Sequence, residues 1–271
     1  MSHLTIAVST VFELSEKLNE KINCYLSRLD ENISFLVIVQ RSSKEYTLHE
    51  NPRLKVIFTK QSGLSKSRNM ALRNCSSSYV WFQDDDIDLN PPVVNNMSYE
   101  LCSRNIDLMF LKIESKELRG TPFKPYDFHQ RPSIFNSFKI SSIEIVIRCS
   151  FQQEHNIWFD ENLGLGTNLP SCEENLFSYQ LIRSSGGYND RIGIYDGFVA
   201  SHTTLTDQRN IDIENRVRAR GYLIASLSII HGLMLFVRWS TRHEASGIMC
   251  RLRRARLLIA GVVIKYFKKA S

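Results

Sequence analysis

Residues 79–88 read YVWFQDDDID, an apolar strand pattern that ends in three consecutive aspartates, Asp84, Asp85 and Asp86. Adjacent carboxylates repel one another, so this cluster lowers stability unless a cation neutralises it. Carboxylate oxygens at the end of a strand suit Mg²⁺ or Mn²⁺ that holds a substrate phosphate. The alternative is a solvated acidic turn that caps a helix starting near Pro91. The position directly after an apolar strand favours a binding site.

The segments around this stretch alternate between strand and helix patterns. The pattern predicts strands over residues 3–10, 34–40, 53–59, 79–83 and 105–113, and helices over 13–29, 64–75, 91–104 and 173–184. This order predicts an α/β fold with a mostly parallel sheet and helices on its faces. Ligands of such sheets bind outside the carboxyl ends of the strands. Residues 115–140 contain three prolines and no clear period, and are predicted to form a loop that covers a site.

Length and composition place the chain among ordinary globular proteins. It has 271 residues, of which 43% are hydrophobic and 23% are charged. These values exclude a disordered chain, a collagen-like chain and a polytopic membrane protein. The six cysteines include no C-x-x-C pair, which argues against a zinc site and a disulfide framework. The first residues show no signal-peptide pattern, so the cytoplasm is the expected compartment.

Positive charge is concentrated at the carboxyl end of the chain. Residues 215–271 hold twelve Lys or Arg and a single acid, Glu244, whereas the net charge of the whole chain is +6. The preceding residues are therefore acidic overall. A basic tail on an acidic body predicts that the tail meets a negative surface, either nucleic acid or anionic lipid. Nucleic acid is the weaker candidate, because no nucleic-acid-binding motif is present.

Two segments of this tail are apolar enough to meet lipid. Residues 222–237 form a 16-residue apolar run. As a helix it spans about 24 Å, short of the roughly 30 Å hydrocarbon core, so a helix in the interface or packed on the core is favoured over a transmembrane helix. Residues 248–267 show an amphipathic pattern that suits an anionic leaflet, with packing on the α/β domain as the alternative. Its apolar face comprises Ile248, Leu252, Ala255, Ile259, Val262, Val263 and Tyr266.

Three further segments carry groups suited to phosphate or proton chemistry. Residues 63–69 read GLSKSRN, and a helix start with free N–H groups and cations favours an anion, although an ordinary capped helix looks the same. Residues 159–166 read FDENLGLG, and Glu173 and Glu174 then open a helix. One of these carboxylates is a candidate general base, or both only offset the helix dipole. His202 ends a strand pattern, where a lone histidine is more often structural.

In this order and spacing, the segments resemble glycosyltransferase family 2, whose members have the Rossmann-like GT-A fold. The resemblance covers roughly residues 3–205 and is closest to the bacterial polysaccharide-synthesising members. It implies that Asp86 and His202 bind a divalent metal, Mn²⁺ or Mg²⁺, and that Glu174 deprotonates the acceptor hydroxyl. It also implies a nucleotide site made of Thr10, Gln40, Gly63, Arg68, Asp84 and Asp85.

Two positions depart from the family pattern. Gln40 and Arg41 stand where many members have an Asp pair that grips the base. A Gln amide can still accept from a pyrimidine N3–H and donate to O4, so uracil and thymine stay compatible. Cys172, Glu173 and Glu174 stand in place of the family's Gly-Glu-Asp. The base would therefore be one methylene longer, and Glu173 is the alternative base.

The resemblance implies a metal-dependent, inverting glycosyltransferase, with a GT-A domain over residues 1–208 and a basic helical tail over 209–271. One base and one metal-bound leaving group suit direct displacement, whereas a glycosidase needs two carboxylates flanking the bond. The expected partners are a nucleotide-diphosphate sugar, an anionic membrane surface on the inner face of the cell membrane, and a lipid-linked glycan of capsule, O-antigen or exopolysaccharide assembly.

The sequence has two alternative interpretations. A sugar-phosphate nucleotidyltransferase would need a glycine-rich segment where residues 9–12 read STVF, which argues against it. The second alternative is a non-catalytic, membrane-bound scaffold with a degenerate site, suggested by Gln40 and Glu174. Such a scaffold would show no metal-dependent nucleotide binding.

Overall fold

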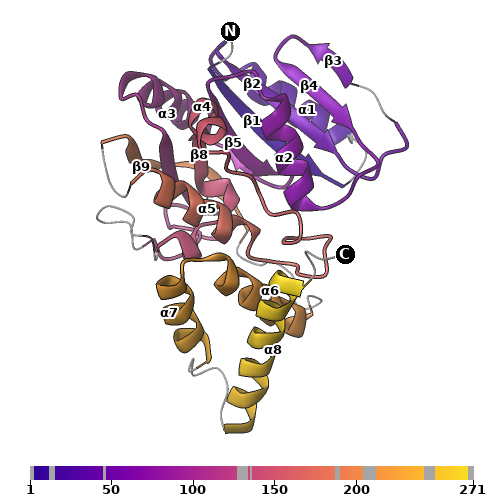
Figure 1. Cartoon of the computed structure of the whole chain (residues 1–271). Coiled ribbons are helices and arrows are strands. Elements are labelled where there is room, and N and C mark those ends of the chain that lie inside the picture. Colours follow the sequence, from indigo (N-terminus) through magenta and orange to yellow (C-terminus); the bar gives the residue numbers. More distant parts are fainter. Residues whose placement is uncertain are drawn as a thin grey trace.

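A nine-stranded mixed sheet forms the larger part of the structure, a computed structural model of the chain (Figure 1). The structure describes residues 3–11, 16–44, 47–126, 134, 136–186, 190–203, 212–240 and 248–267. The strands are β1 (Leu4–Thr10), β2 (Ile33–Val39), β3 (Thr47–Asn51), β4 (Leu54–Phe58), β5 (Tyr79–Asp84), β6 (Asp88–Leu89), β7 (Leu108–Ser115), β8 (Ile145–Arg148) and β9 (Ile192–His202). The helices are α1 (Glu16–Leu26), α2 (Leu64–Asn74), α3 (Pro91–Ser103), α4 (Cys149–Glu154), α5 (Glu173–Ser184), α6 (Ile213–Ser226), α7 (Ile229–Ser240) and α8 (Ile248–Phe267), with 3-10 turns η1 (Asn136–Lys139) and η2 (Ser142–Glu144).

The predicted mostly parallel sheet is confirmed. The strand order is β3-β4-β2-β1-β5-β8-β7-β9-β6. Six strands (β1, β2, β4, β5, β7 and β9) run in one direction, and β3, β6 and β8 run against them. The central strands β1, β2 and β5 are buried along nearly their whole length because helices cover both faces of the sheet.

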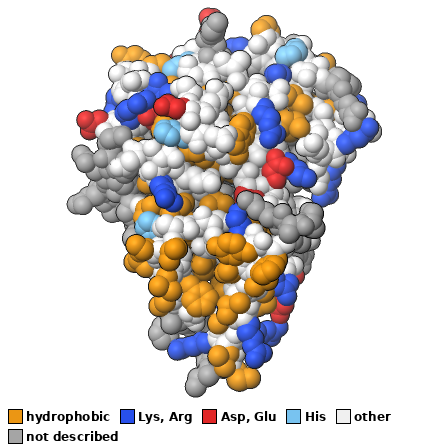
Figure 2. All heavy atoms as spheres, viewed as in Figure 1, with side chains coloured by type: hydrophobic (Ala, Val, Ile, Leu, Met, Phe, Trp, Pro, Cys, Tyr) orange, Lys and Arg blue, Asp and Glu red, His pale blue; other side chains and the backbone are white. Residues whose placement is uncertain are grey.

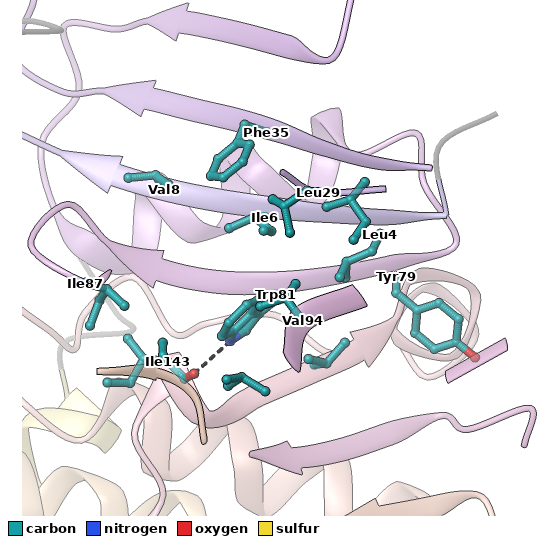
Figure 3. Packing of buried hydrophobic residues seen from close by; sticks show 14 of the residues in the cluster. Leu4, Ile6, Val8, Leu29, Phe35, Tyr79, Trp81, Ile87, Val94 and Ile143 are labelled. Carbon is teal, nitrogen blue, oxygen red and sulfur yellow. Dashed lines mark hydrogen bonds between the residues drawn. The ribbon is translucent and has the colours of Figure 1, made fainter. Parts of the chain in front are cut away.

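Each face of the sheet has its own hydrophobic core. Side chains alternate along a strand, so Leu4 and Ile6 of β1 pack with α1 and α3, while Ala7 packs with α2 and α5 on the other face. Figure 3 shows the first of these cores, in which Trp81 is fully buried. Its indole N–H donates to the Ile143 carbonyl at 2.7 Å, so the buried polar group is satisfied.

The strand expected over residues 105–113 is observed as β7, which begins three residues later. Asn105 has φ of 51°, a left-handed conformation that turns the chain out of α3 before the strand begins. The sequence pattern did not predict β3 or β8, which are short strands at or beside the antiparallel part of the sheet. Much of the loop expected over 115–140 lies outside the described residues, and so does its expected role as a cover.

The tail consists of α6, α7 and α8 at the end of the molecule away from the sheet (Figure 1). The apolar run 222–237 is not one helix, as Leu227 is extended, with ψ of 174°, and separates α6 from α7. Among the described helices, none is long and apolar enough to span a bilayer. The expected domain boundary at residues 208–209 falls outside the described residues.

Helices α6 and α8 pack at backbone contact through two glycines. A Cβ atom placed on Gly261 of α8 would lie 1.9 Å from the Arg218 carbonyl oxygen of α6, and one on Gly221 would lie 2.0 Å from that of Leu258. Leu258 is fully buried in this contact. Conversely, Leu252 of α8, on the apolar face that the sequence predicts, is 53% exposed. The tail therefore buries the glycine side of α8 and leaves much of that apolar face in solvent, although Val262 packs in the tail core.

Candidate active site

The site lies where β1, β2 and β5 end side by side at one edge of the sheet. Thr10 ends β1 opposite Val39 of β2, and Ser9 pairs with Asp84 of β5. The carboxyl ends of parallel strands thereby bring together residues that are more than seventy positions apart in sequence. This is the edge at which open α/β sheets bind ligands.

Gln40 and Gly63 join the end of β2 to the start of α2. The buried Gln40 accepts a hydrogen bond from the Gly63 backbone N–H at 2.8 Å through Oε1. Gly63 has φ of 123°, which favours glycine, and a Cβ on Gly166 would lie only 3.0 Å from its Cα. The amide oxygen expected to face a pyrimidine base thus already supports the α2 loop, against which the loop containing Gly166 packs.

The three aspartates after β5 have different surroundings. Asp85 accepts a hydrogen bond from the Thr10 hydroxyl at 2.6 Å. Asp84, Asp86 and His202 each offer one ligand atom, and these atoms all lie within 4.8 Å of one another. Loss of hydration raises the pKa of Asp84, Asp86 raises it further, and the Arg68 guanidinium opposes both. Two carboxylates facing each other at this distance suit a cation between them.

The hydrogen bonds of His202 fix which ring nitrogen faces the aspartates. Its Nδ1 lies 2.6 Å from the Thr203 carbonyl oxygen, which only accepts, so Nδ1 carries the proton. Nε2 is therefore the nitrogen that faces Asp86, 3.6 Å from one of its oxygens. A backbone carbonyl that holds one nitrogen while the other faces a metal is a common arrangement of ligating histidines. Phe123 packs edge-on against the ring, with 4.9 Å between ring centroids.

Arg68 connects the aspartates to the acidic pair of α5. Its side chain is 5% exposed, and it lies 3.2 Å from a Glu173 oxygen and 3.6 Å from an Asp84 oxygen. The guanidinium also lies over the Phe159 ring, 5.4 Å from its centroid. The resemblance implies that Arg68 lies near the nucleotide phosphates or base. In the structure it bridges two carboxylates, which holds both acidic groups at fixed positions.

Glu173 and Glu174 differ in their partners although they are adjacent. Arg68 pairs with Oε1 of Glu173, and each of the two carboxyl groups keeps one buried oxygen, Oε2, that has no hydrogen-bond partner among the described residues. Loss of hydration and the neighbouring Glu173 raise the pKa of Glu174 well above its usual range, and Arg68 lowers it only in part. A carboxyl group with a raised pKa suits a general base that works near neutral pH. Glu173 and Glu174 are both candidates for this role, and the raised pKa distinguishes Glu174 from its neighbour.

Residues 28–160 match the family model described as Glycosyl transferase family 2. The chain carries a glycosyltransferase family 2 domain. The match includes the α2 motif, the three aspartates and the start of the FDENLGLG segment. The α/β domain of the chain is therefore that of a glycosyltransferase.

Solved structures show the fold of this glycosyltransferase in other proteins. The crystal structure of S. aureus TarS 1–349 in complex with UDP-GlcNAc has a TM-score of 0.68 and 17% identity, over 96% of this chain and 81% of that one. TarS 1–349 alone gives a TM-score of 0.63 and 16% identity, over 98% of this chain and 91% of that one. The GT-A fold is thereby shown. No curated protein matches the chain significantly.

Asn69 is a further residue of the glycosyltransferase site, and the sequence motifs that contain it do not reveal its role. Asn69 of α2 donates to the Phe159 carbonyl at 2.9 Å and to Glu161 at 3.0 Å, and accepts from the Phe159 N–H at 2.9 Å. These bonds fix the FDENLGLG segment on α2. Its position directly after Arg68 was the signal for such a role, but its partners lie ninety residues away and no spacing rule reveals them.

Proposed function

We propose that this glycosyltransferase is metal-dependent and inverting, and that it moves a sugar from a nucleotide-diphosphate sugar to a glycan acceptor. The observation that carries the proposal is the pairing, through Arg68, of an aspartate–histidine cluster with an acidic pair that includes a carboxyl of raised pKa. The fold shared with TarS, which was crystallised with UDP and with UDP-GlcNAc, supports a UDP-sugar donor.

Asp84, Asp86 and His202 would hold the divalent cation. Two carboxylate oxygens and one imidazole nitrogen within 4.8 Å of one another suit Mn²⁺ and Mg²⁺, with the remaining positions open to diphosphate oxygens. When bound, the cation supplies positive charge that stabilises the diphosphate leaving group. Thr10 holds Asp85 beside this cluster, and Lys116 donates to the Asp86 carbonyl at 2.5 Å, which fixes the acidic loop.

Glu174 accepts the proton of the acceptor hydroxyl in this proposal. As that O–H bond breaks, the acceptor oxygen bonds to the anomeric carbon, and the bond from this carbon to the diphosphate breaks with its electron pair on the diphosphate. A single displacement of this kind inverts the anomeric carbon. Arg68 contributes by pairing with Glu173, which leaves Glu174 as the carboxyl that takes the proton.

The acceptor is proposed to be a lipid-linked glycan of bacterial surface polysaccharide synthesis, with the enzyme peripheral on the inner face of the cell membrane. The tail supports this location. Figure 2 shows hydrophobic side chains gathered over the tail, with Lys and Arg near its tip. Exposed apolar residues of α7, including Ile230 and Leu233, lie on the same tail as the arginines of α8. Apolar groups flanked by cations favour an anionic leaflet.

The test is calorimetric binding of UDP, GDP and dTDP, each with and without Mn²⁺. Wild-type protein is expected to bind one nucleotide more tightly with Mn²⁺, and Asp86→Ala to weaken that binding at least about tenfold. Asp196→Ala is the matched control, because this aspartate of β9 is 92% exposed and does not belong to the cluster. Failure of the folded wild-type protein to bind any nucleotide would reject the metal-dependent transferase and favour the scaffold.

A further inference from the structure

A cavity of about 620 Å³ lies between the α/β domain and the tail. One wall comes from the start of α2 and the loop over residues 161–169, and the other from α6 and α8. Figure 1 shows the carboxyl end of α8 returning to the side of the α/β domain, where this wall lies. The residues assigned above to the nucleotide, the metal or the base do not line the cavity. The loop over residues 161–169, which lies beside them, does.

The cavity contains three cationic side chains, Lys66, Arg218 and Lys265. Lys66 has no ion pair or hydrogen bond among the described residues. Glu161 is the acidic residue of the described lining, and it is already engaged by Asn69 at 3.0 Å and by Arg73 at 3.8 Å. Arg218 pairs with Glu214 of α6 at 3.6 Å, and Lys265 pairs with Asp160 at 3.2 Å. Lys66 is therefore the cation of the described lining that has no acidic partner, and through it the cavity favours an anionic ligand.

Amide and hydroxyl groups fill much of the remaining wall. Asn162, Thr167, Asn168, Asn215 and Tyr222 supply donors and acceptors of the kind that bind sugar hydroxyls. Cations combined with such neutral polar groups suit a glycan that carries an acidic group. A purely apolar ligand, such as a lipid chain, would place these polar groups and the cations of the lining against hydrocarbon, which is unfavourable.

Lys265 is held in place before any ligand arrives. Its Nζ lies 3.2 Å from an Asp160 oxygen and 3.2 Å from the Tyr222 hydroxyl, which itself donates to Asp160 at 2.9 Å. Burial disfavours the charge on Asp160, but hydrogen bonds from Asn162 and the charge of Lys265 outweigh it and lower the pKa of Asp160. Preorganised groups lose less entropy when a ligand binds.

One loop connects the cavity to the acidic pair. A Cβ on Gly164 would lie 3.0 Å from the Glu173 carboxyl carbon, so this glycine packs directly against that side chain. Gly166, two residues further on, lines the cavity. A ligand in the cavity thus lies across a single loop from the carboxyl groups that would take a proton from an acceptor.

We propose that this cavity is an acceptor subsite, in which Lys66, Arg218 and Lys265 bind an anionic group of the acceptor, either a phosphate or a sugar carboxylate. The proposal rests on the transferase function above. It differs from that function in assigning the binding of the acceptor to the junction between the α/β domain and the tail.

The test compares two double variants with the wild-type protein by calorimetry. Lys66→Gln/Arg218→Gln removes two cations that line the cavity. Lys60→Gln/Arg216→Gln is the control, because it removes one Lys before α2 and one Arg of α6 that do not line the cavity. The probes are inorganic pyrophosphate and glucuronate in EDTA, and, separately, UDP with Mn²⁺. Pyrophosphate or glucuronate is expected to bind the cavity variant at least about tenfold more weakly than the other two proteins, with UDP affinity unchanged.

Binding of pyrophosphate alone would assign the anion to a phosphate, and binding of glucuronate alone to a sugar carboxylate; both support the proposal. The proposal would be overturned if neither probe bound the wild-type protein. It would also be overturned if the two double variants bound the probes with equal affinity. A tenfold loss of UDP affinity in the cavity variant alone would also overturn it, because the cavity would then belong to the donor site. Absence of UDP binding in all three proteins would count against the transferase function only.

Discussion

At the scale of single residues, the acidic pair on α5 shows how one ion pair gives different surroundings to adjacent identical side chains. Arg68 lies 3.2 Å from Oε1 of Glu173, whereas the second oxygen of each carboxyl group is buried without a hydrogen-bond partner among the described residues. The pKa of Glu174 is raised by lost hydration and by the neighbouring carboxyl, so this group holds a proton at pH values where an exposed glutamate has lost it.

Glu174→Gln tests this division of roles. Transfer is expected to fall at least about hundredfold, because a general base contributes roughly 10²- to 10⁴-fold. Glu173→Gln is the matched comparison, and a larger loss there would reassign the base. The measurement is the initial rate of sugar transfer from the donor identified by nucleotide binding, with nucleotide affinity as the check that the donor still binds.

Glu174→Gln is also expected to change how the free energy of unfolding depends on pH. A carboxyl whose pKa is raised on folding stabilises the protein below its unfolded-state pKa, and this contribution is lost as the pH rises through the folded-state pKa. Wild-type protein is therefore expected to lose stability on going from acidic to mildly alkaline pH, and Glu174→Gln to lose less. Urea unfolding across this range measures the difference, and parallel curves for the two proteins would contradict the raised pKa.

The site carboxylates could be predicted from local motifs, because their positions after strands and at a helix start carry the signal. The role of Arg68 could not, since its partner Glu173 lies 105 positions away in the sequence. The same holds for Gln40, whose oxygen is occupied by Gly63. Motifs identify which groups are present, whereas pairing among them depends on how distant segments pack.

At the scale of elements, the crossing of α6 and α8 depends on the absence of side chains. Gly221 and Gly261 allow the two backbones to touch, and a Cβ on either would meet a carbonyl oxygen at about 2 Å. The sequence pattern does not predict this close crossing, because a glycine inside a helix ordinarily indicates only a less stable helix. The amphipathic pattern left open whether the apolar face of α8 meets lipid or packs on the α/β domain. In the structure Leu252 and Ile259 of that face are more than half exposed, whereas Val262 packs with Leu257 and Leu258 into the tail core.

Gly261→Ala is expected to destabilise the protein, whereas replacing a glycine inside a helix by alanine usually stabilises it. In an unconstrained helix the change stabilises by up to about 1 kcal/mol. Here the new methyl group meets the Arg218 carbonyl, and a net destabilisation of about 1–3 kcal/mol is expected from overpacking. Chemical unfolding with a constant denaturant slope gives the value, and a gain in stability would show that the helices do not cross at this distance.

The break between α6 and α7 is a second feature that periodicity could not reveal. The run 222–237 contains no proline, and its glycine lies inside α7 rather than at the break. Leu227 ends α6 in an extended conformation, and the Ser228 N–H donates to the Tyr179 hydroxyl at 3.1 Å. The break therefore depends on a contact with α5, which tertiary packing supplies.

At the scale of the whole molecule, the tail presents an apolar and basic surface while the α/β domain presents the site. Ile230 and Leu233 of α7 are 71% and 63% exposed, and Leu252 and Ile259 of α8 are more than half exposed. Large exposed apolar groups gathered on one end of a protein mark a surface that meets a partner. The basic residues of α8 favour an anionic one.

Vesicle sedimentation tests the lipid surface as that partner. Wild-type protein is expected to bind vesicles of phosphatidylglycerol and not those of phosphatidylcholine. Ile230→Glu/Leu233→Glu is expected to weaken the binding at least about tenfold, because both apolar burial and charge become unfavourable. Leu118→Glu on the α/β domain is the control, since Leu118 is similarly exposed at 66%. Equal binding of all three proteins would place the membrane contact elsewhere or exclude it.

The position of Lys265 on α8 has a consequence for how surface and site affect each other. Lys265 reaches Asp160 in the α/β domain, while its neighbour Tyr266 is 65% exposed. One rigid helix therefore carries both the bond to the FDENLGLG segment and part of the outer face of the tail. If a bilayer shifts α8, thermodynamic linkage requires the shift to be reciprocal: any factor by which the bilayer changes affinity at the cavity is the factor by which a cavity ligand changes affinity for the bilayer. If the bilayer strengthens ligand binding at the cavity, a bound ligand strengthens membrane binding by the same factor, and if it weakens the one it weakens the other equally.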